Sequence, residues 1–377
     1  MSLPETVLQF GTGRFLRAFA DLFIHQANEA GQKVGKVVLV QSTDGDRAAG
    51  LSQNDGKYHV LVRGYEKGQV VERLEECTSI SRALIASIQW NEILKVATSP
   101  NLKVILSNTT EAGYELSPGD RPADAPPKSF PAKLLAVLRA RFEAGAAPLA
   151  IVPCELRENN AKILKEIVLG LAKDWRLSAS TIDWIANRCT WHNTLVDRIV
   201  TGTPAGHPLL VKDPMLIACE PYALFAIEEV PGSPRWIDHP AVVWTADVLP
   251  YFLRKVRLLN GAHTALLIKA WPAGFKIVRD AVNDTKLGPW LVSLLETEVV
   301  PVLEGRVEQG SAFAREVLDR FRNPFLDHKL ADIAMHHDQK VQVRLVPSRD
   351  EFQAKFGKPA PLLCELLEEG GKLAEPV

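Results

Sequence analysis

Three polar residues, Lys255, Asn260 and His263, lie close together in the sequence Lys-Val-Arg-Leu-Leu-Asn-Gly-Ala-His. On an α-helix, at about 100° per residue, they fall within an arc of about 140° and share one face. A lysine whose pKa is lowered by partial burial and a nearby cation can act as a base, while a neutral amide and imidazole can hydrogen-bond a substrate oxygen. The trio therefore suits alcohol–ketone interconversion; a solvated lysine beside a core histidine is the alternative.

A second group of residues has the pattern of a dinucleotide-binding turn. Gly11, Thr12, Gly13, Arg14 and Phe15 follow an apolar run and open a helical pattern. Two glycines let the backbone turn sharply and approach a pyrophosphate, which then binds at the helix N-terminus. The third glycine of this fingerprint is absent, so a tight strand-to-helix turn without a ligand is the alternative.

Two further turns would complete a dinucleotide site. One predicted strand ends at Gln41, with Asp44 three residues later and Arg47 beyond it. An acidic residue in this region binds the ribose of NAD and an arginine attracts the 2′-phosphate of NADP, so the segment mildly favours NAD and does not exclude NADP. Asn108 and Thr109 follow another predicted strand, where they would contact the nicotinamide ribose or simply form a solvated turn.

The elements that must position these residues begin with a parallel sheet. Short β-branched runs alternate with helical patterns in the first half of the chain, which predicts a doubly wound sheet. The predicted buried strands are residues 7–10, 36–41, 104–107 and 150–153. We further expect a hairpin from 58–64 and 70–79, a surface loop at 118–131, and short strands near 209–212 and 241–244.

The second half of the chain is predicted to be helical. After residue 249, apolar residues recur at three- and four-residue spacing, most clearly in residues 262–271, 289–303 and 312–321. The expected fold class is therefore α/β: an extended Rossmann-like dinucleotide-binding domain over residues 1–246, with insertions in its doubly wound sheet, followed by a mostly α-helical substrate domain over residues 247–377.

Composition excludes several classes of function. The chain has 377 residues, of which 46% are hydrophobic and 24% charged, and a net charge of -1 that provides no field for nucleic acid or an acidic membrane. Five scattered cysteines favour a reducing compartment. With no signal peptide or spanning segment evident, we expect a cytoplasmic protein with a small-molecule substrate, acting as a monomer or weak homo-oligomer.

The chain resembles the mannitol dehydrogenase family, the polyol-specific long-chain dehydrogenases. The family signature is Lys followed after four residues by Asn and after two more by His, as at Lys255, Asn260 and His263. Further motifs match in order at residues 11–19, 153–156 with 159–160, 194–200 and 220–224. Within the family, residues 55–58, 107–113 and 153–156 are most similar to the tagaturonate reductase (altronate oxidoreductase) branch.

This resemblance implies NAD(H)-dependent, metal-independent reduction of a keto sugar acid. It implies that Lys255 is the general acid/base, that Asn160 and Asn260 polarise the reacting oxygen, and that His263 orients the substrate. Asp197 and Arg198 would position the substrate. The chain departs from the family at Ala161, where a glycine is usual, and ends before the usual C-terminus of the long tagaturonate reductases.

Three alternatives remain open. The first is a mannitol or mannitol-1-phosphate type polyol dehydrogenase. The phosphate of mannitol-1-phosphate needs a clamp, and Arg254 and Arg257 flank Lys255, although on a helix they need not face the pocket and a carboxylate would be bound equally well. A zinc enzyme would have to use Cys189 with His192 or the residues 335–338, which lack the spacing of a recognised site. A non-catalytic dinucleotide sensor would have no reason to keep the Lys-Asn-His trio.

Overall fold

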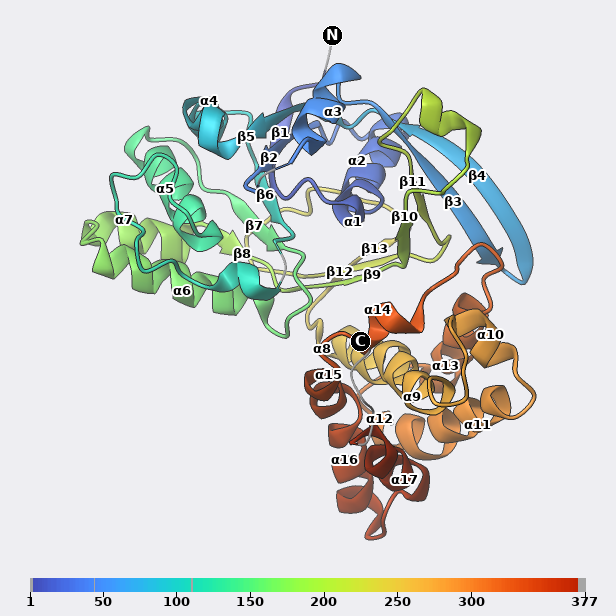
Figure 1. The fold of residues 1–377 in the computed structure, drawn as a ribbon. Helices are drawn as coiled ribbons and strands as arrows, with labels where there is room; N and C mark the ends of the chain where they lie inside the picture. The colour runs from blue at the N-terminus through green and yellow to red at the C-terminus, as the bar shows by residue number, and fades with distance from the viewer. Residues whose placement is uncertain (1–2, 44, 110, 372–377) are drawn as a thin grey trace. The chain divides into compact units, whose positions relative to one another are not determined.

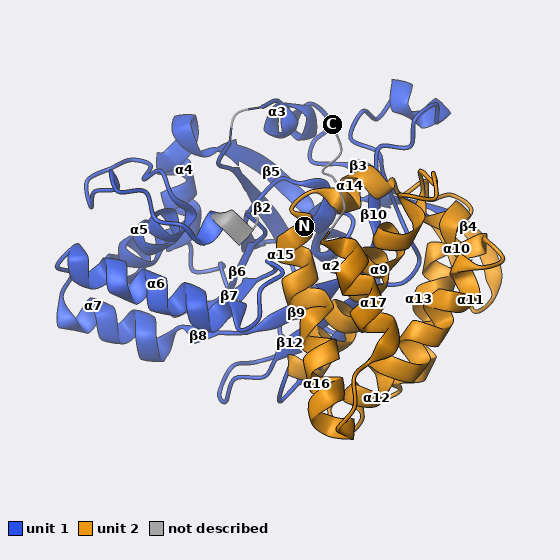
Figure 2. Ribbon diagram, turned by 60° about the horizontal axis from the view of Figure 1, so that its bottom comes forward, with its two compact units in different colours: residues 1–62, 73–248 blue, residues 63–72, 249–377 orange. Residues whose placement is uncertain are grey.

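The protein consists of two compact units in a computed structural model that describes residues 3–43, 45–109 and 111–371. Unit 1 contains residues 1–62 and 73–248, and unit 2 contains residues 63–72 and 249–377 (Figure 2).

Unit 1 is built on a six-stranded parallel sheet with the order β5-β2-β1-β6-β7-β8 (Figure 1). The strands are β1 (Glu5–Phe10), β2 (Lys36–Gln41), β5 (Ile80–Ile85), β6 (Val104–Ser107), β7 (Ala150–Pro153) and β8 (Thr190–Trp191). The four strands predicted from the sequence are confirmed, and β5 and β8 are additional. Because the chain runs from β1 to β2 on one side and returns to β6 on the other, the sheet is doubly wound.

Both faces of this sheet are buried, which explains its uninterrupted apolar strands. In β2, Val37 and Leu39 face one core while Val38 and Val40 face the other. The first core is completed by α1 (Arg14–Arg17), α2 (Ala20–Glu29) and α3 (Arg47–Gln53). The second contains residues of α4 (Ala86–Thr98), α5 (Phe130–Glu143) and α6 (Asn160–Asp174). The helices therefore cover both faces, as predicted for a Rossmann-like domain.

The remaining strands form two smaller sheets. One has the order β10-β11-β3-β4 and the other β13-β12-β9. Their strands are β3 (Tyr58–Glu66), β4 (Gln69–Cys77), β9 (Thr194–Asp197), β10 (Val200–Gly202), β11 (Ile217–Cys219), β12 (Leu224–Glu228) and β13 (Val242–Thr245). The predicted hairpin is confirmed as β3 and β4, and the strand expected near 241–244 as β13. The tip of the hairpin belongs to unit 2, where Asn323 Nδ2 donates to the carbonyl oxygen of Arg63 at 3.1 Å.

The strand expected near residues 209–212 is wrong. Pro208–Val211 forms a 3₁₀ turn instead. His207 caps it by accepting a hydrogen bond from the backbone N–H of Leu209, and Leu209 and Leu210 pack on a small core with Leu61. The apolar run therefore reflects packing of a turn, and Pro208 favours that turn by fixing φ at its start.

Unit 2 is helical apart from the hairpin tip. A nearly fully buried helix, α9 (Gly261–Ala270), packs against several of the others, as expected for a central helix that is mostly apolar. The others are α8 (Leu249–Leu253), α10 (Val278–Asn283), α11 (Leu287–Leu294), α12 (Val300–Leu303), α13 (Gly310–Phe321), α14 (Leu330–Ala334), α15 (His337–Arg344), α16 (Val346–Phe356) and α17 (Pro361–Gly370). No helix among the described residues is long and apolar enough to cross a membrane.

Candidate active site

The first glycine of the predicted dinucleotide turn lies where the strand order of the sheet reverses. Gly11 follows β1, between β2 and β6, and its backbone N–H donates to the carbonyl oxygen of Val40. Its φ is +120°, and a Cβ added there would lie 2.8 Å from the carbonyl oxygen of Asn108. Only glycine fits this turn. The reversal point is also where doubly wound sheets bind their ligands.

The second glycine keeps the entrance to α1 open. Gly13 precedes the helix in an extended conformation, and a Cβ added there would meet no atom within 4 Å. Thr12 is buried, Arg14 is exposed, and Phe15 stacks on Phe19 with ring centroids 4.9 Å apart. The open space beside Gly13 therefore leaves room for a phosphate to approach the turn, which fits a dinucleotide.

The side chain of Gln41 forms hydrogen bonds within the turn after β2. Its side chain is buried and donates hydrogen bonds to the carbonyl oxygens of Thr43 and Gly45, while its Oε1 accepts one from the N–H of Ala48. The amide therefore orders the turn after β2, and this geometry does not support direct ribose binding by Gln41. Asp44 lies outside the described residues.

The side chain of Glu155 holds the turn after β6 in place, a role that the sequence did not predict. Glu155 accepts hydrogen bonds from Ser107 Oγ (3.0 Å), from Thr109 N and Oγ1 (2.9 and 3.0 Å) and from Tyr114 Oη (3.2 Å). Burial raises the pKa of Glu155, and the hydrogen bonds from Thr109 and Ser107 act in the opposite direction. Asn108 Nδ2 donates to the carbonyl oxygen of Cys154 at 2.7 Å. Contacts to Cys154 and Glu155, which follow β7, thus hold the turn of Asn108 and Thr109, and the backbone of Asn108 lies beside Gly11.

Asn160 is fully buried, with 0% exposure, and its side-chain amide forms hydrogen bonds within unit 1. Its Nδ2 lies 3.1 Å from the carbonyl oxygens of both Pro153 and Glu155 and 3.0 Å from Thr194 Oγ1. Its Oδ1 accepts from the N–H groups of Ala161 and Thr194. The nitrogen has only two hydrogens, so this geometry does not support the expected polarisation of a substrate oxygen. Asn160 instead ties the end of β7 to β9.

Arg198 and Asp197 are also buried in unit 1. The guanidinium of Arg198 donates to the carbonyl oxygens of Glu220 (2.9 Å) and Ala18 (2.8 Å). Ala18 lies at the break between α1 and α2, so Arg198 fixes the end of the first helical turn after Gly13. This geometry does not support direct substrate contact by Arg198. Asp197 is the last residue of β9, where it pairs with Leu224.

Asp21 on α2 is a titratable residue that Gln9 connects to the predicted dinucleotide turn at Gly11. Gln9 Nε2 donates both to Asp21 Oδ2 and to the carbonyl oxygen of Gly11, each at 3.1 Å. Burial raises the pKa of Asp21 to about 7, opposed by the hydrogen bond from Gln9 and by the charge of Arg17. The folded protein therefore favours the neutral carboxyl.

Replacing Asp21 by asparagine should remove a pH dependence of stability. Because the folded pKa is raised, the stabilisation from neutral Asp21 is complete below about pH 4, near the unfolded pKa, and is lost as the pH rises through about 7. The melting temperature of the wild type should fall relative to that of Asp21→Asn between pH 5 and pH 8. Parallel thermal denaturation curves of the two proteins over that range would contradict the prediction.

The predicted catalytic segment is not a plain α-helix. Residues Arg254–Asn260 form a π-helix, and α9 starts at Gly261. A π-helix has i to i+5 hydrogen bonds and is frequently found at functional sites. Lys255 and Asn260 are five residues apart, so a helix with this hydrogen bonding places them closer to one line than the about 140° that separates them on an α-helix. The common face of the whole trio stays a prediction.

His263 lies in the first turn of α9 in an apolar but cation-rich surrounding. Its ring stacks on Phe321 with centroids 4.1 Å apart and meets His328 edge-on at 4.8 Å. Burial lowers its pKa well below the ordinary value, with further lowering by His328 and by Arg344, Arg320 and Lys340. The imidazole is therefore neutral, and its buried Nε2 has no hydrogen-bond partner in the described part of the chain.

The basic residues near His263 are not the arginines suggested by the sequence. Arg257 is buried and bound to Ser348 Oγ (2.9 Å) and Glu351 (2.8 Å), and Arg254 stacks over Phe313. Neither geometry supports an anion clamp. The cations close to His263 are instead Arg320, Arg344 and Lys340. They come from distant parts of the chain, so no local spacing in the sequence predicts them. Arg344 Nη1 donates to Thr264 Oγ1 on α9 at 3.2 Å.

Two family models match the chain. The mannitol dehydrogenase Rossmann domain matches residues 5–238, and the mannitol dehydrogenase C-terminal domain matches residues 247–366.

Curated relatives with the name altronate oxidoreductase are similar over nearly the whole chain. The protein of Cronobacter sakazakii is 36% identical over 379 residues, covering 96% of this chain and 78% of its own length. That of Halalkalibacterium halodurans is 37% identical over 382 residues, covering 97% and 74%. That of Bacillus subtilis is 36% identical over 375 residues, covering 94% and 76%.

Two solved structures share the fold. Mannitol 2-dehydrogenase of Pseudomonas fluorescens, solved with NAD and D-mannitol, superposes with a TM-score of 0.82 at 22% identity, covering 98% of this chain and 79% of that one. A D-sorbitol dehydrogenase in substrate-free form superposes with a TM-score of 0.84 at 21% identity, covering 98% and 80%. At this identity they establish the architecture alone.

Proposed function

The chain belongs to the mannitol dehydrogenase family, and from this premise we propose that it is an NAD(H)-dependent oxidoreductase that interconverts a keto sugar acid and its hydroxy acid. Tagaturonate and altronate represent the substrate class, in line with the altronate oxidoreductases it resembles. The observation that carries the reaction type is the π-helix that stacks Lys255 and Asn260 one turn before a neutral His263.

The two units, residues 1–62 with 73–248 and residues 63–72 with 249–377, have separate tasks in this proposal. Unit 1 binds the dinucleotide at Gly11, Gly13 and the turn of Asn108 and Thr109. The space beside Gly13, which a Cβ would enter without touching another atom, suits a pyrophosphate. NADH supplies a hydride to the carbonyl carbon of the substrate when it is bound. Asn160 and Arg198 hold the ends of β7, β9 and α1 in place through hydrogen bonds within this unit.

Unit 2 supplies the proton and the polar contacts. Lys255 Nζ donates a proton to the carbonyl oxygen during reduction and accepts the hydroxyl proton in the reverse direction. The amide of Asn260 donates a hydrogen bond to the same oxygen and stabilises the negative charge that develops on it. His263 stays neutral and orients the substrate by hydrogen bonding through its unpartnered Nε2.

The basic residues around His263 favour a sugar acid over a neutral polyol. Arg320, Arg344 and Lys340 bring positive charge close to a buried imidazole, and a carboxylate on the substrate would offset that charge. Arginine binds carboxylates with two parallel hydrogen bonds, which gives orientation as well as affinity. The positive charge around His263 therefore supports a small anion as the substrate.

The compartment follows from the cysteines. All five are free thiols, and four of them are buried, an arrangement typical of proteins in a reducing environment. We place the enzyme in the cytoplasm on this ground.

A substrate panel tests the proposal directly. Keto sugar acids, neutral ketoses and ketose phosphates are each supplied with NADH and with NADPH, and the loss of nicotinamide absorbance is recorded. We expect the highest kcat/KM for a keto sugar acid with NADH. A neutral ketose as the best substrate would move the assignment to a mannitol-type dehydrogenase, and inactivity with every pair would favour a dinucleotide sensor.

Activity should survive metal removal. Proton donation by Lys255 and hydrogen bonding by Asn260 stabilise the oxygen without a Lewis acid, so saturating EDTA should leave turnover unchanged. In the described residues no three His, Cys, Asp or Glu side chains form a group that could hold a metal, and burial raises the pKa of the Cys189 thiol to about 11. Inactivation by EDTA that zinc reverses would instead support the zinc-dependent alternative.

A further inference from the structure

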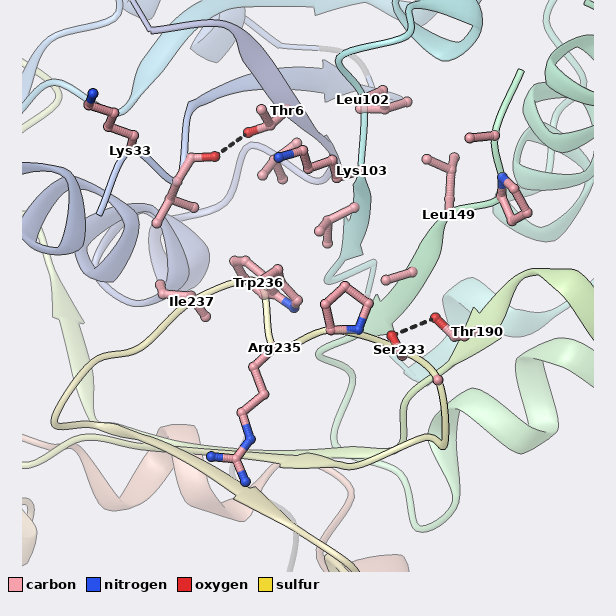
Figure 3. A pocket seen from close by; sticks show the side chains of 18 of the residues that line it. Thr6, Lys33, Leu102, Lys103, Leu149, Thr190, Ser233, Arg235, Trp236 and Ile237 are labelled. Atoms are coloured by element: carbon pink, nitrogen blue, oxygen red, sulfur yellow. Dashed lines mark hydrogen bonds between the residues drawn. The ribbon is translucent and has the colours of Figure 1, made fainter. Parts of the chain in front are cut away.

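Unit 1 contains a cavity of about 820 Å³ that lies away from the cofactor turn. It is lined by the first residues of the central strands, including Thr6 of β1, Val104 of β6 and Ala150 of β7. Gly11 follows the opposite end of β1, so the cavity and the cofactor turn are at opposite edges of the same sheet. The loop of residues 232–238 forms the other wall (Figure 3).

The cavity is held open by contacts within unit 1. Trp244 Nε1 donates to the carbonyl oxygen of Ile237 at 3.0 Å, and Asp238 N donates to Gln32 Oε1 at 3.0 Å. Both contacts fasten the 232–238 loop, one to β13 and one to the segment before β2. The wall is therefore preformed, as binding cavities for small molecules usually are.

The interior offers an aromatic surface between aliphatic walls. The indole of Trp236 lies in the cavity between the strand starts and the loop, facing residues such as Leu102 and Leu149 (Figure 3). Its Nε1 is buried without a hydrogen-bond partner within the described chain. Tryptophan offers a large flat surface for stacking together with one N–H donor, so a planar ring with an acceptor atom complements this wall.

Two hydroxyl groups also line the cavity. Ser233 Oγ and Thr190 Oγ1 lie 3.1 Å apart (Figure 3). Each also contacts His192 Nε2, at 3.1 and 3.0 Å. His192 Nδ1 lies 2.8 Å from the carbonyl oxygen of Glu228 and must donate to it, so Nε2 is the acceptor in the neutral ring. Burial lowers the pKa of His192, which keeps the ring neutral. The histidine can accept only one hydroxyl hydrogen, which leaves the pair able to hydrogen-bond a ligand.

The rim of the cavity is positive. Lys33, Lys103 and Arg188 line it and are exposed, and among the described residues of the lining Asp238 is the one acidic side chain. Arg235 also belongs to the lining, but it is bound to Glu229 and turned away from the cavity (Figure 3). Three cations against one carboxylate give a rim that attracts an anion.

We propose that this cavity is a second binding site, for an organic anion with a planar ring and the size of a mononucleotide. The ring stacks on Trp236, a phosphate or carboxylate group lies toward Lys103 and Arg188, and the Ser233–Thr190 pair binds a polar substituent. The volume falls within the range of about 300–1,000 Å³ that small-molecule sites occupy. Because the site is at the opposite sheet edge from Gly11, it does not depend on the proposed reaction and can be filled together with the cofactor site.

Isothermal titration calorimetry on the NADH-saturated protein tests the proposal. NADH is present in excess so that nucleotides do not bind at the Gly11 turn. The probes are AMP, phenyl phosphate and inorganic phosphate. We expect one site per chain for a ring-bearing probe, with an affinity at least tenfold higher than for inorganic phosphate. Binding of AMP alone would identify a nucleotide ligand, and binding of phenyl phosphate as well would identify a broader class of aromatic anions.

Variants assign the binding to this cavity. Trp236→Ala and Lys103→Ala should each weaken binding by tenfold or more, while Trp236→Phe, which keeps a ring, should retain most of it. Lys95→Ala on α4 is the matched control, because Lys95 is an exposed lysine of unit 1 outside the cavity. The proposal is overturned if neither ring-bearing probe binds in the presence of NADH. It is equally overturned if probes bind Trp236→Ala and Lys103→Ala as tightly as the wild type.

Discussion

Lys255→Ala should lower turnover by about 10²–10⁴-fold while NADH still binds, since this is the usual contribution of a positioned acid/base group. The lysine is in unit 2, and the dinucleotide turn of Gly11 and Gly13 is in unit 1. Its replacement removes the proposed proton donor without altering that turn. The effect should therefore appear in kcat and kcat/KM together, as expected for an interaction made in the transition state.

Three measurements separate this role from a structural one. Steady-state rates give kcat, fluorescence titration gives the Kd for NADH, and a thermal melt reports folding. Lys286→Ala is the control, because Lys286 is an exposed lysine of unit 2 just before α11, and it should leave all three values unchanged. A Lys255→Ala enzyme with near-normal turnover would remove Lys255 from the mechanism. A variant with an unchanged melting temperature but weakened NADH binding would contradict the division of tasks between the units.

Strand and helix patterns could be predicted because burial selects them locally. The apolar run of β2 serves two cores at once, so its residues are apolar at every position. Strand β5 could not be predicted in the same way, because Ser81 and Arg82 interrupt its apolar pattern and both bind Glu5. The 3₁₀ turn at Pro208–Val211 shows the converse, since a short apolar run alone does not distinguish a strand from a packed turn.

The positions of the candidate site residues could be predicted from the sequence better than their roles could. Gln41 was expected at the end of a strand and is found there, and Asn160 was expected beside the reacting oxygen and is the first residue of α6, but the amides of both satisfy backbone groups. Unpaired backbone groups at the end of a strand need partners as much as a ligand does, and residue type does not say which of the two an amide will serve. Only the three-dimensional contacts decide this.

The geometry of Lys255 and its surroundings also depends on distant residues. Its spacing to Asn260 fits an α-helix and a π-helix equally well, so the tighter alignment found here could not be read from the sequence. The cations around His263 are at positions 320, 340 and 344, brought near it by α13 and α15 of unit 2. The net charge of -1 for the whole chain therefore does not reveal the local group of cations around His263.

Gly11→Ala should both destabilise unit 1 and weaken NADH binding. The φ of +120° at Gly11 is strained for any residue with a Cβ, and that Cβ would lie 2.8 Å from the carbonyl oxygen of Asn108, a backbone atom that cannot rotate away. Backbone strain and overpacking each cost about 1–3 kcal/mol, so we expect the free energy of unfolding to fall by roughly 2–4 kcal/mol. Relief of the clash would move the turn of Asn108 and Thr109, and binding should weaken by about tenfold or more as a result.

Gly13→Ala provides the matched comparison two residues away. Gly13 has φ of −65°, which any residue adopts, and an added Cβ meets no atom within 4 Å. Its melting temperature should equal that of the wild type, yet the KM for NADH should rise, because the methyl group enters the space that the pyrophosphate needs. Gly11→Ala thus tests the fold of the turn, and Gly13→Ala tests its ligand. Normal NADH binding by a stably folded Gly13→Ala protein would show that the cofactor does not approach the chain at this turn.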